Sequence, residues 1–97
     1  MSILNSVMRE EYNRLNRIID KIEYEIAELP KGYISKKTIN DKVYFYLQFK
    51  ECGKVKSVYI KKEDVETYRS MIERRKGLLL KLEELQADKK KLEKVLK

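Results

Sequence analysis

The stretch that decides the fold is YISKKTINDKVYFYLQFKECGKVKSVYI, residues 33–60. Two turn dipeptides, Asn40-Asp41 and Cys52-Gly53, divide it into three runs that are rich in β-branched and aromatic residues. Two-residue breaks between such runs are typical of tight β-hairpins. The sequence therefore predicts a β-meander of three antiparallel strands, at 33–39, 42–50 and 54–60.

The alternation of side chains sorts this expected sheet into two faces. With two-residue turns, Ile39 pairs with Lys42, and Glu51 pairs with Lys54. The face expected to cover a core receives Ile34, Val43, Phe45, Leu47, Phe49, Val58 and Ile60. The opposite, polar face receives Tyr33, Ser35, Lys37, Tyr44, Tyr46, Gln48, Lys50, Ser57 and Tyr59.

Helical periodicity flanks the sheet on both sides. Apolar residues from Met8 to Leu29 step alternately by four and three positions, which is an unbroken heptad seam. Pro30 ends this helix, because the residue before a proline is pushed out of the α region. A second helix is expected from about Glu63, with Gly77 in its interior at a cost of about 1 kcal/mol relative to Ala.

These segments predict a single α+β domain. Its parts are a helix over 1–29, a basic β-meander over 31–61 and a longer helix over 62–97. Because both helices adjoin the same small sheet, we expect them to form an antiparallel, coiled-coil-like pair. The second helix is expected to extend past the first. For its tail, two outcomes stay open: fraying, or pairing with a second copy of the chain as a homodimer. Gly77 is either a tolerated surface position or the site of a kink or a close helix approach.

The net charge of +7 is concentrated in the middle of the chain. Residues 31–62 contain nine basic and two acidic side chains and carry +7, whereas residues 1–30 carry −2 and residues 63–97 carry +2. An even distribution would serve mainly solubility. Charge confined to one segment indicates a surface for an anionic partner.

Residues that carry catalysis are scarce. The chain has no histidine and one cysteine, Cys52, so ordinary zinc sites, Cys–His nucleophiles and internal disulfides are excluded. Its three glycines lie too far apart for a phosphate-binding loop. No segment has the pattern of a signal peptide or of a membrane span. We therefore expect a cytoplasmic, non-enzymatic protein that has no cofactor, metal or small-molecule substrate and no membrane partner.

The polar face of the meander is the candidate binding site. Tyrosine rings with lysines beside them suit base stacking and phosphate contact. They equally suit a hot spot for a protein partner, or cross-strand pairs that only stiffen the sheet. The candidate partner-binding residues are Tyr33, Lys37, Tyr44, Tyr46, Gln48, Lys50, Lys56 and Tyr59.

The central third of the chain also resembles known sequences. GYIS at 32–35, VYFYLQF at 43–49 and GKVKSVYI at 53–60 resemble a recurrent module of uncharacterised bacterial, phage and mobile-element proteins. A three-stranded sheet before a helix is similar in outline to the amino-terminal DNA-binding domains of phage-type integrases, which place a sheet face in the major groove. This chain differs from them in the long helix before the sheet. In size and style it resembles anti-CRISPR inhibitors, with no shared motif.

Three hypotheses follow. In the first, the chain engages nucleic acid through the meander, with Tyr44, Tyr46 and Tyr59 stacking on bases or hydrogen-bonding, and Lys37, Lys50 and Lys56 neutralising phosphates. In the second, it is a protein-binding inhibitor, such as an anti-CRISPR that blocks a nuclease effector. In the third, it is a coiled-coil assembly module.

Overall fold

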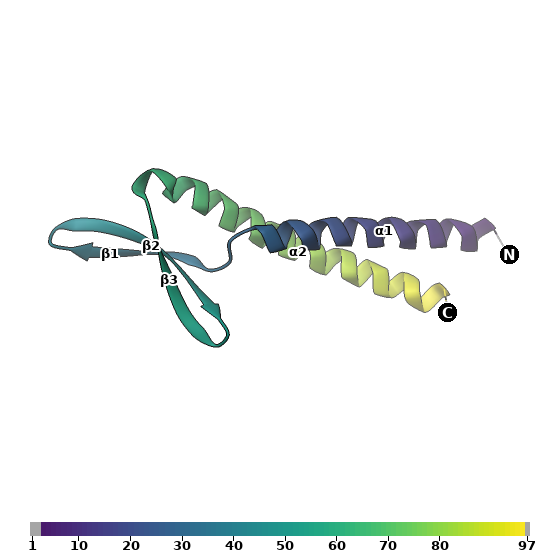
Figure 1. Ribbon diagram of the computed structural model, residues 1–97. Coiled ribbons are helices and arrows are strands. Elements are labelled where there is room, and N and C mark those ends of the chain that lie inside the picture. Colours follow the sequence, from purple (N-terminus) through teal and green to yellow (C-terminus); the bar gives the residue numbers. More distant parts are fainter. Residues whose placement is uncertain (1–2, 97) are drawn as a thin grey trace. The chain divides into compact units, whose positions relative to one another are not determined.

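The computed structural model describes residues 3–96, and it has the expected α+β order (Figure 1). Residues 1–2 and 97 of the expected helices lie outside the described residues. The elements are α1 (Ile3–Glu28), β1 (Tyr33–Ile39), β2 (Lys42–Glu51), β3 (Lys54–Ile60), a one-turn 3₁₀ helix (Lys62–Asp64) and α2 (Val65–Leu96).

The sheet confirms the predicted strand order and register. The strands pair antiparallel in the order β1-β2-β3, with Ile39 opposite Lys42 and Glu51 opposite Lys54. Asn40, Asp41, Cys52 and Gly53 all have positive φ, as two-residue turns between twisted strands require. Strand β2 is one residue longer than predicted, because Glu51 still pairs with β3.

The two hairpins diverge along β2. Residues 45–48 pair on both sides, whereas 42–44 pair only with β1 and 49–51 pair only with β3. The two turns therefore lie at opposite ends of β2, and the hairpins point in different directions (Figure 1).

The contacts divide the chain into two compact units. The sheet unit is Leu29–Lys76, and the helical unit is α1 together with α2 from Gly77 onward. Gly77, at this boundary, is exposed, and a Cβ built there would meet no atom within 4 Å. This excludes a close helix approach at Gly77, which is a surface position; a kink there stays a prediction.

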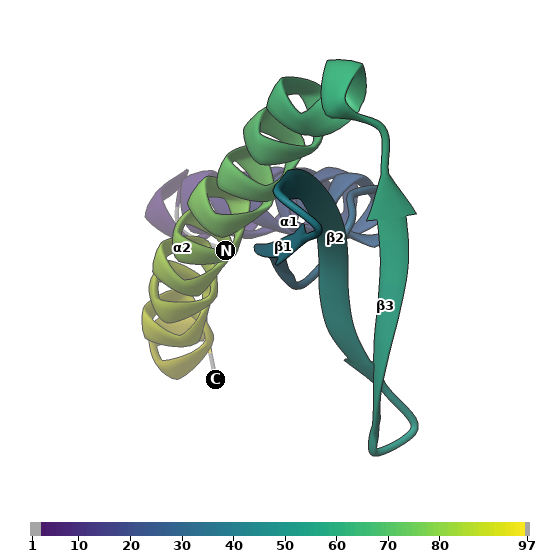
Figure 2. The same cartoon turned by 90° about the vertical axis from the view of Figure 1, so that its left-hand side faces the viewer.

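The first turns of α2 cover the apolar face of the sheet (Figure 2). Leu47 and Ile60 are buried against Val65 and Ile72 of α2. Half-buried side chains surround them: Ile34, Phe45, Phe49 and Tyr68.

Two residues of the predicted core face are exposed. Val43 is 44% exposed and Val58 is 48% exposed. Val43 lies near the first turn, where β2 has only β1 beside it, and Val58 lies on the edge strand β3. Strand alternation predicts the face of a side chain but not how far α2 extends over that face.

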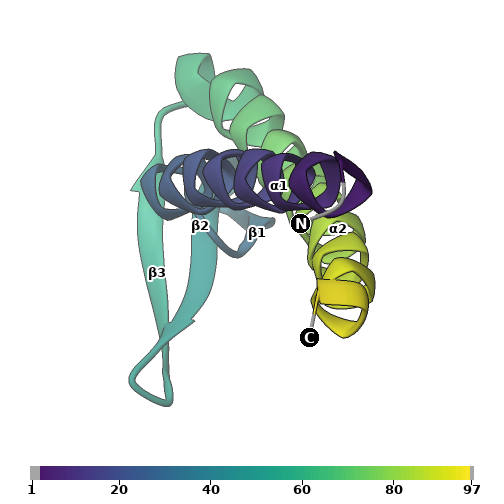
Figure 3. The ribbon, with the colours of Figure 1, turned by 90° about the vertical axis from the view of Figure 1, so that its right-hand side faces the viewer.

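The helical unit is an antiparallel pair, with the start of α1 and the end of α2 at the same end (Figure 3). Leu15, Ile19 and Leu85 form its buried core. Four half-buried side chains surround them: Ile18, Ile22, Leu82 and Leu92.

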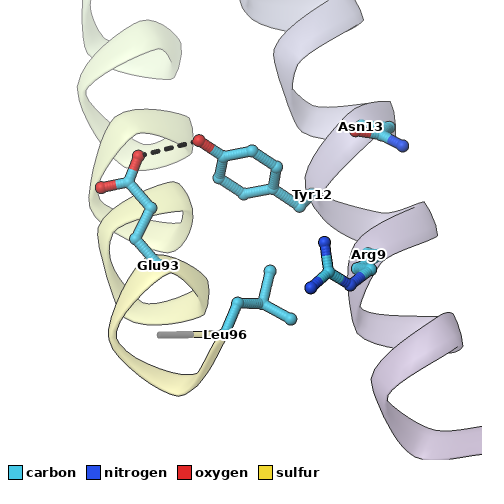
Figure 4. Close-up of a pocket in the computed structure, with 5 residues that line it drawn as sticks. All are labelled: Arg9, Tyr12, Asn13, Glu93 and Leu96. Atoms are coloured by element: carbon cyan, nitrogen blue, oxygen red, sulfur yellow. Dashed lines mark hydrogen bonds between the residues drawn. The ribbon is translucent and has the colours of Figure 1, made fainter. Parts of the chain in front are cut away.

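The end of α2 contacts α1. The Tyr12 hydroxyl donates a hydrogen bond to Glu93 Oε1 at 3.0 Å (Figure 4). The Lys89 ammonium lies 5.7 Å from the centroid of the Tyr12 ring. The expected overhang of the tail is therefore not observed over the described residues. The extra length of α2 is instead at its start, where its first turns pack on the sheet.

Candidate nucleic-acid interface

The strand register brings seven of the eight predicted site residues to one side of the sheet. Tyr33 is opposite Gln48, Lys37 is opposite Tyr44, and Tyr46 is opposite Tyr59. Residues two apart on a strand share a face, so Lys50 joins them on β2. We call this side of the sheet the tyrosine face; the predicted site residues on it are Tyr33, Lys37, Tyr44, Tyr46, Gln48, Lys50 and Tyr59.

The structure does not bring Lys56 to this surface. Lys56 is the partner of Phe49, so it lies on the side of Val58 and Ile60. Its ammonium is 3.8 Å from the Glu51 carboxylate, with both side chains about half exposed. The grouping of Lys56 with the tyrosines is therefore corrected. The alternation of side chains along β3 already predicts that Lys56 lies on the apolar side of the sheet, because it is two residues from Val58.

Three tyrosines form a contiguous aromatic cluster in the middle of the tyrosine face. The Tyr59 ring lies 5.9 Å from that of Tyr46 in an edge-to-face arrangement and 6.4 Å from that of Tyr44, tilted by 56°. Rings at these separations and angles attract one another beyond the burial of their area. The cluster therefore holds its rings in place before any partner arrives.

Polar contacts fix two further side chains of the face. The Lys37 ammonium is 5.0 Å from the centroid of the Tyr46 ring, within the range of a cation–π interaction. The Tyr33 hydroxyl donates a hydrogen bond to Gln48 Oε1 at 2.5 Å. Positive charge and aromatic surface are thus in direct contact, on the side of the sheet opposite the α2 residues that bury Leu47 and Ile60.

The most exposed rings of the tyrosine face lie on the two outer strands. Tyr33 on β1 is 60% exposed and Tyr59 on β3 is 55% exposed, whereas Tyr44 and Tyr46 on β2 are half-buried. Lys37 and Lys50 are exposed. The tyrosine face is therefore accessible to a partner.

The same face also carries exposed residues near the strand ends that are not among the predicted site residues. The register places Ile39 opposite Lys42, and Val55 opposite Lys50, all on the tyrosine face. The alternation of side chains that predicts the face of the tyrosines also predicts these residues when it is followed to the ends of the strands.

The helical unit offers a different kind of surface. A pocket of about 440 Å³ between its helices is lined by Arg9, Tyr12, Asn13, Glu93 and Leu96 (Figure 4). Also on α1, Arg14 donates hydrogen bonds to Glu11 and lowers the pKa of that carboxyl group. Among residues 3–96, no group of three or more Asp, Glu, Cys or His side chains is placed to hold a metal ion. No helix in this range is long and apolar enough to cross a membrane.

Fold and site together define a small α+β protein with a basic, aromatic sheet face. The chain belongs to the DUF6788 family, a domain of unknown function, whose model matches residues 12–70. The match includes most of α1, the whole sheet and the first turns of α2, so it contains the entire tyrosine face. No curated protein and no solved structure matches the chain.

Proposed function

We propose that this chain is a non-enzymatic nucleic-acid-binding protein of phage or mobile-element type, and that it engages its partner through the tyrosine face. The observation that carries the proposal is the solvent-facing cluster of tyrosines with Lys37, Lys42 and Lys50 on the same side of the sheet. Lysines contact phosphates, and aromatic rings stack on bases.

The sheet provides its own control, because it carries three exposed lysines on each side. Lys37, Lys42 and Lys50 lie on the tyrosine face, and Lys36, Lys54 and Lys56 lie on the opposite side. Replacing either set by Glu changes the net charge by the same amount. Only the first set would remove charge from the proposed interface.

The test is fluorescence anisotropy with labelled single-stranded DNA, duplex DNA and RNA at low and physiological salt. We expect K37E/K42E/K50E to abolish binding and K36E/K54E/K56E to retain most of it. Circular dichroism would verify that both variants fold. Equal loss in the two variants would place binding outside the tyrosine face. An unmodified chain that binds no nucleic acid at low salt would contradict the proposal.

Salt dependence gives a second readout. The logarithm of the binding constant falls with the logarithm of salt concentration by about 0.7 per phosphate contact on a single strand and about 0.9 on a duplex. With three lysines on the face we expect a slope of about −2 to −3. Replacing one of them, K50Q, should make the slope shallower by roughly one contact, whereas K54Q should leave it unchanged.

The second candidate is a protein partner, favoured by the exposed Ile39 and Val55 at the rim of the tyrosine face. In this function the chain would be an inhibitor that blocks a nuclease effector, as an anti-CRISPR does. Free nucleic acid would then bind weakly, and one effector would bind tightly. Y46A or Y59A should weaken that complex by roughly 2 kcal/mol if either tyrosine is a hot spot.

Self-association is the third candidate. Leu80 and Val95 of α2 and Val7 of α1 are exposed apolar side chains on the helical unit. As a coiled-coil assembly module, the chain would form a dimer whose population depends on concentration and is unaffected by changes to the tyrosines. Light scattering across a dilution series, with the unmodified chain and Y46A/Y59A, tests this function.

A further inference from the structure

We infer that the tyrosine face binds single-stranded nucleic acid, with little sequence preference, by stacking bases on its rings. This inference rests on the proposed function and specifies the form of the nucleic acid. It follows from three features of the face: the arrangement of its rings, the chemistry of its charges and the shortage of groups that read base edges.

The rings are arranged as a platform. Along β2, Lys42, Tyr44, Tyr46, Gln48 and Lys50 are successive residues of one face, so lysines lie at both ends and aromatic rings lie between them. The exposed rings of Tyr59 and Tyr33 flank this row on β3 and β1. Aromatic side chains within a positively charged track are the usual means of holding a single strand.

A duplex cannot use this platform in the same way. Its bases are already stacked on one another, so their flat faces are closed to protein rings, and it presents only phosphates and base edges in its grooves. The exposed rings of Tyr33 and Tyr59 would then gain no stacking partner. A single strand offers unstacked bases and phosphates together.

The charges of the face suit phosphates rather than base edges. All nine basic residues of the segment 31–62 are lysines, and none is an arginine. Bidentate contacts from arginine to guanine are the commonest specific contacts in the major groove, whereas lysine acts as a compact point charge. The face therefore has charge for the backbone without the side chain best suited to recognise a base.

The one amide of the platform is already engaged. Gln48 accepts a hydrogen bond from the Tyr33 hydroxyl through Oε1, and reading adenine requires both ends of a Gln amide. Binding that relies on ring stacking tolerates any base, because every base has a flat face. We therefore expect little sequence preference.

The row from Lys42 to Lys50 spans at most about 27 Å, at about 3.4 Å per residue of antiparallel strand. An oligonucleotide of about 12 nucleotides is therefore an adequate probe, since small single-strand-binding domains cover roughly 4–16 nucleotides. Three probes of this length separate the contributions: a single strand, the duplex of the same sequence, and a strand of the same length with abasic sites. The abasic strand keeps the phosphates and lacks the bases.

A local reporter of stacking is available because the chain contains no tryptophan. In Tyr59→Trp, the emission of the new indole reports contact at β3 alone. We expect the single strand to quench this emission and to bind at least tenfold more tightly than the duplex or the abasic strand. Two single strands of scrambled sequence should bind within about threefold of each other.

Two matched variants test the ring itself. Y59F keeps the aromatic ring and should retain affinity for the single strand, whereas Y59L keeps apolar bulk without a ring and should lose at least fivefold. Because Tyr59 is more than half exposed, both should fold, which circular dichroism verifies.

The outcomes separate this inference from the proposed function. Duplex binding as tight as single-strand binding, lost in K37E/K42E/K50E, would overturn the inference and leave the proposed function standing. Equal affinity for the abasic strand, or for the Y59L and Y59F variants, would overturn stacking. No binding to any of the three probes at low salt would overturn both.

Discussion

Gly32 is the single residue on which the entry into the sheet depends most. Its φ is +112°, a conformation that side-chain-bearing residues rarely adopt. A Cβ built at Gly32 would lie 2.1 Å from the carbonyl oxygen of Gln48, which is backbone and cannot turn aside. The chain between α1 and β1 can therefore pass β2 this closely only with a glycine.

We predict that Gly32→Ala destabilises the fold by more than the roughly 1–3 kcal/mol expected from backbone strain alone, since it also adds a steric clash. The control is Gly53→Ala, where φ is +79° but a Cβ meets no atom within 4 Å, so only the conformational cost applies. Urea denaturation of both variants measures the difference. Equal midpoints would show that the clash at Gly32 is relieved without cost.

At the residue scale, the alternation of side chains along a strand is enough to predict which face of the sheet each one lies on. The predicted strands and two-residue turns place the tyrosines, Lys37 and Lys50 on one face, and the register confirms this. The charge of Lys56 favours a place beside the tyrosines, but its position on β3, opposite Phe49, puts it on the other side of the sheet. The contact of the Lys37 ammonium with the Tyr46 ring was beyond prediction, since it depends on side-chain conformation.

At the scale of the element, α2 has two roles in one continuous helix. Its first turns supply Val65 and Ile72 to the core of the sheet unit, and its later turns supply Leu85 to the helical unit. Periodicity predicts a long second helix but not the division of its apolar residues between two cores. That division depends on what each half of the helix packs against, and the periodicity of its apolar residues does not specify the packing partner.

Gly77 lies where these two roles meet, inside a helix and open to solvent. We predict that Gly77→Ala raises the free energy of unfolding by roughly 0.5–1 kcal/mol, because alanine restricts the unfolded chain and favours the helix, and nothing opposes its methyl group. Thermal and urea denaturation measure this gain. A loss of stability would mean that the helix needs the flexibility of glycine at this position.

At the scale of the whole molecule, the two cores share no buried residue within the part of the chain that the structure describes. Leu47, Ile60, Val65 and Ile72 make up one, and Leu15, Ile19 and Leu85 make up the other. Of the helices and strands between residues 3 and 96, only α2 runs through both units. Local openings of a protein follow its contiguous contact groups, so each unit is expected to open with its own free energy.

We therefore predict that one core can be weakened selectively. Leu85→Ala and Ile72→Ala each remove a buried aliphatic side chain, which typically costs about 2–5 kcal/mol. In hydrogen exchange, Leu85→Ala should accelerate the amides of α1 far more than those of β2, and Ile72→Ala should do the reverse. If both variants accelerate all amides equally, the chain opens as one cooperative body. With selective opening, Leu85→Ala should keep the nucleic-acid affinity of the tyrosine face, because that face is built within the sheet unit alone.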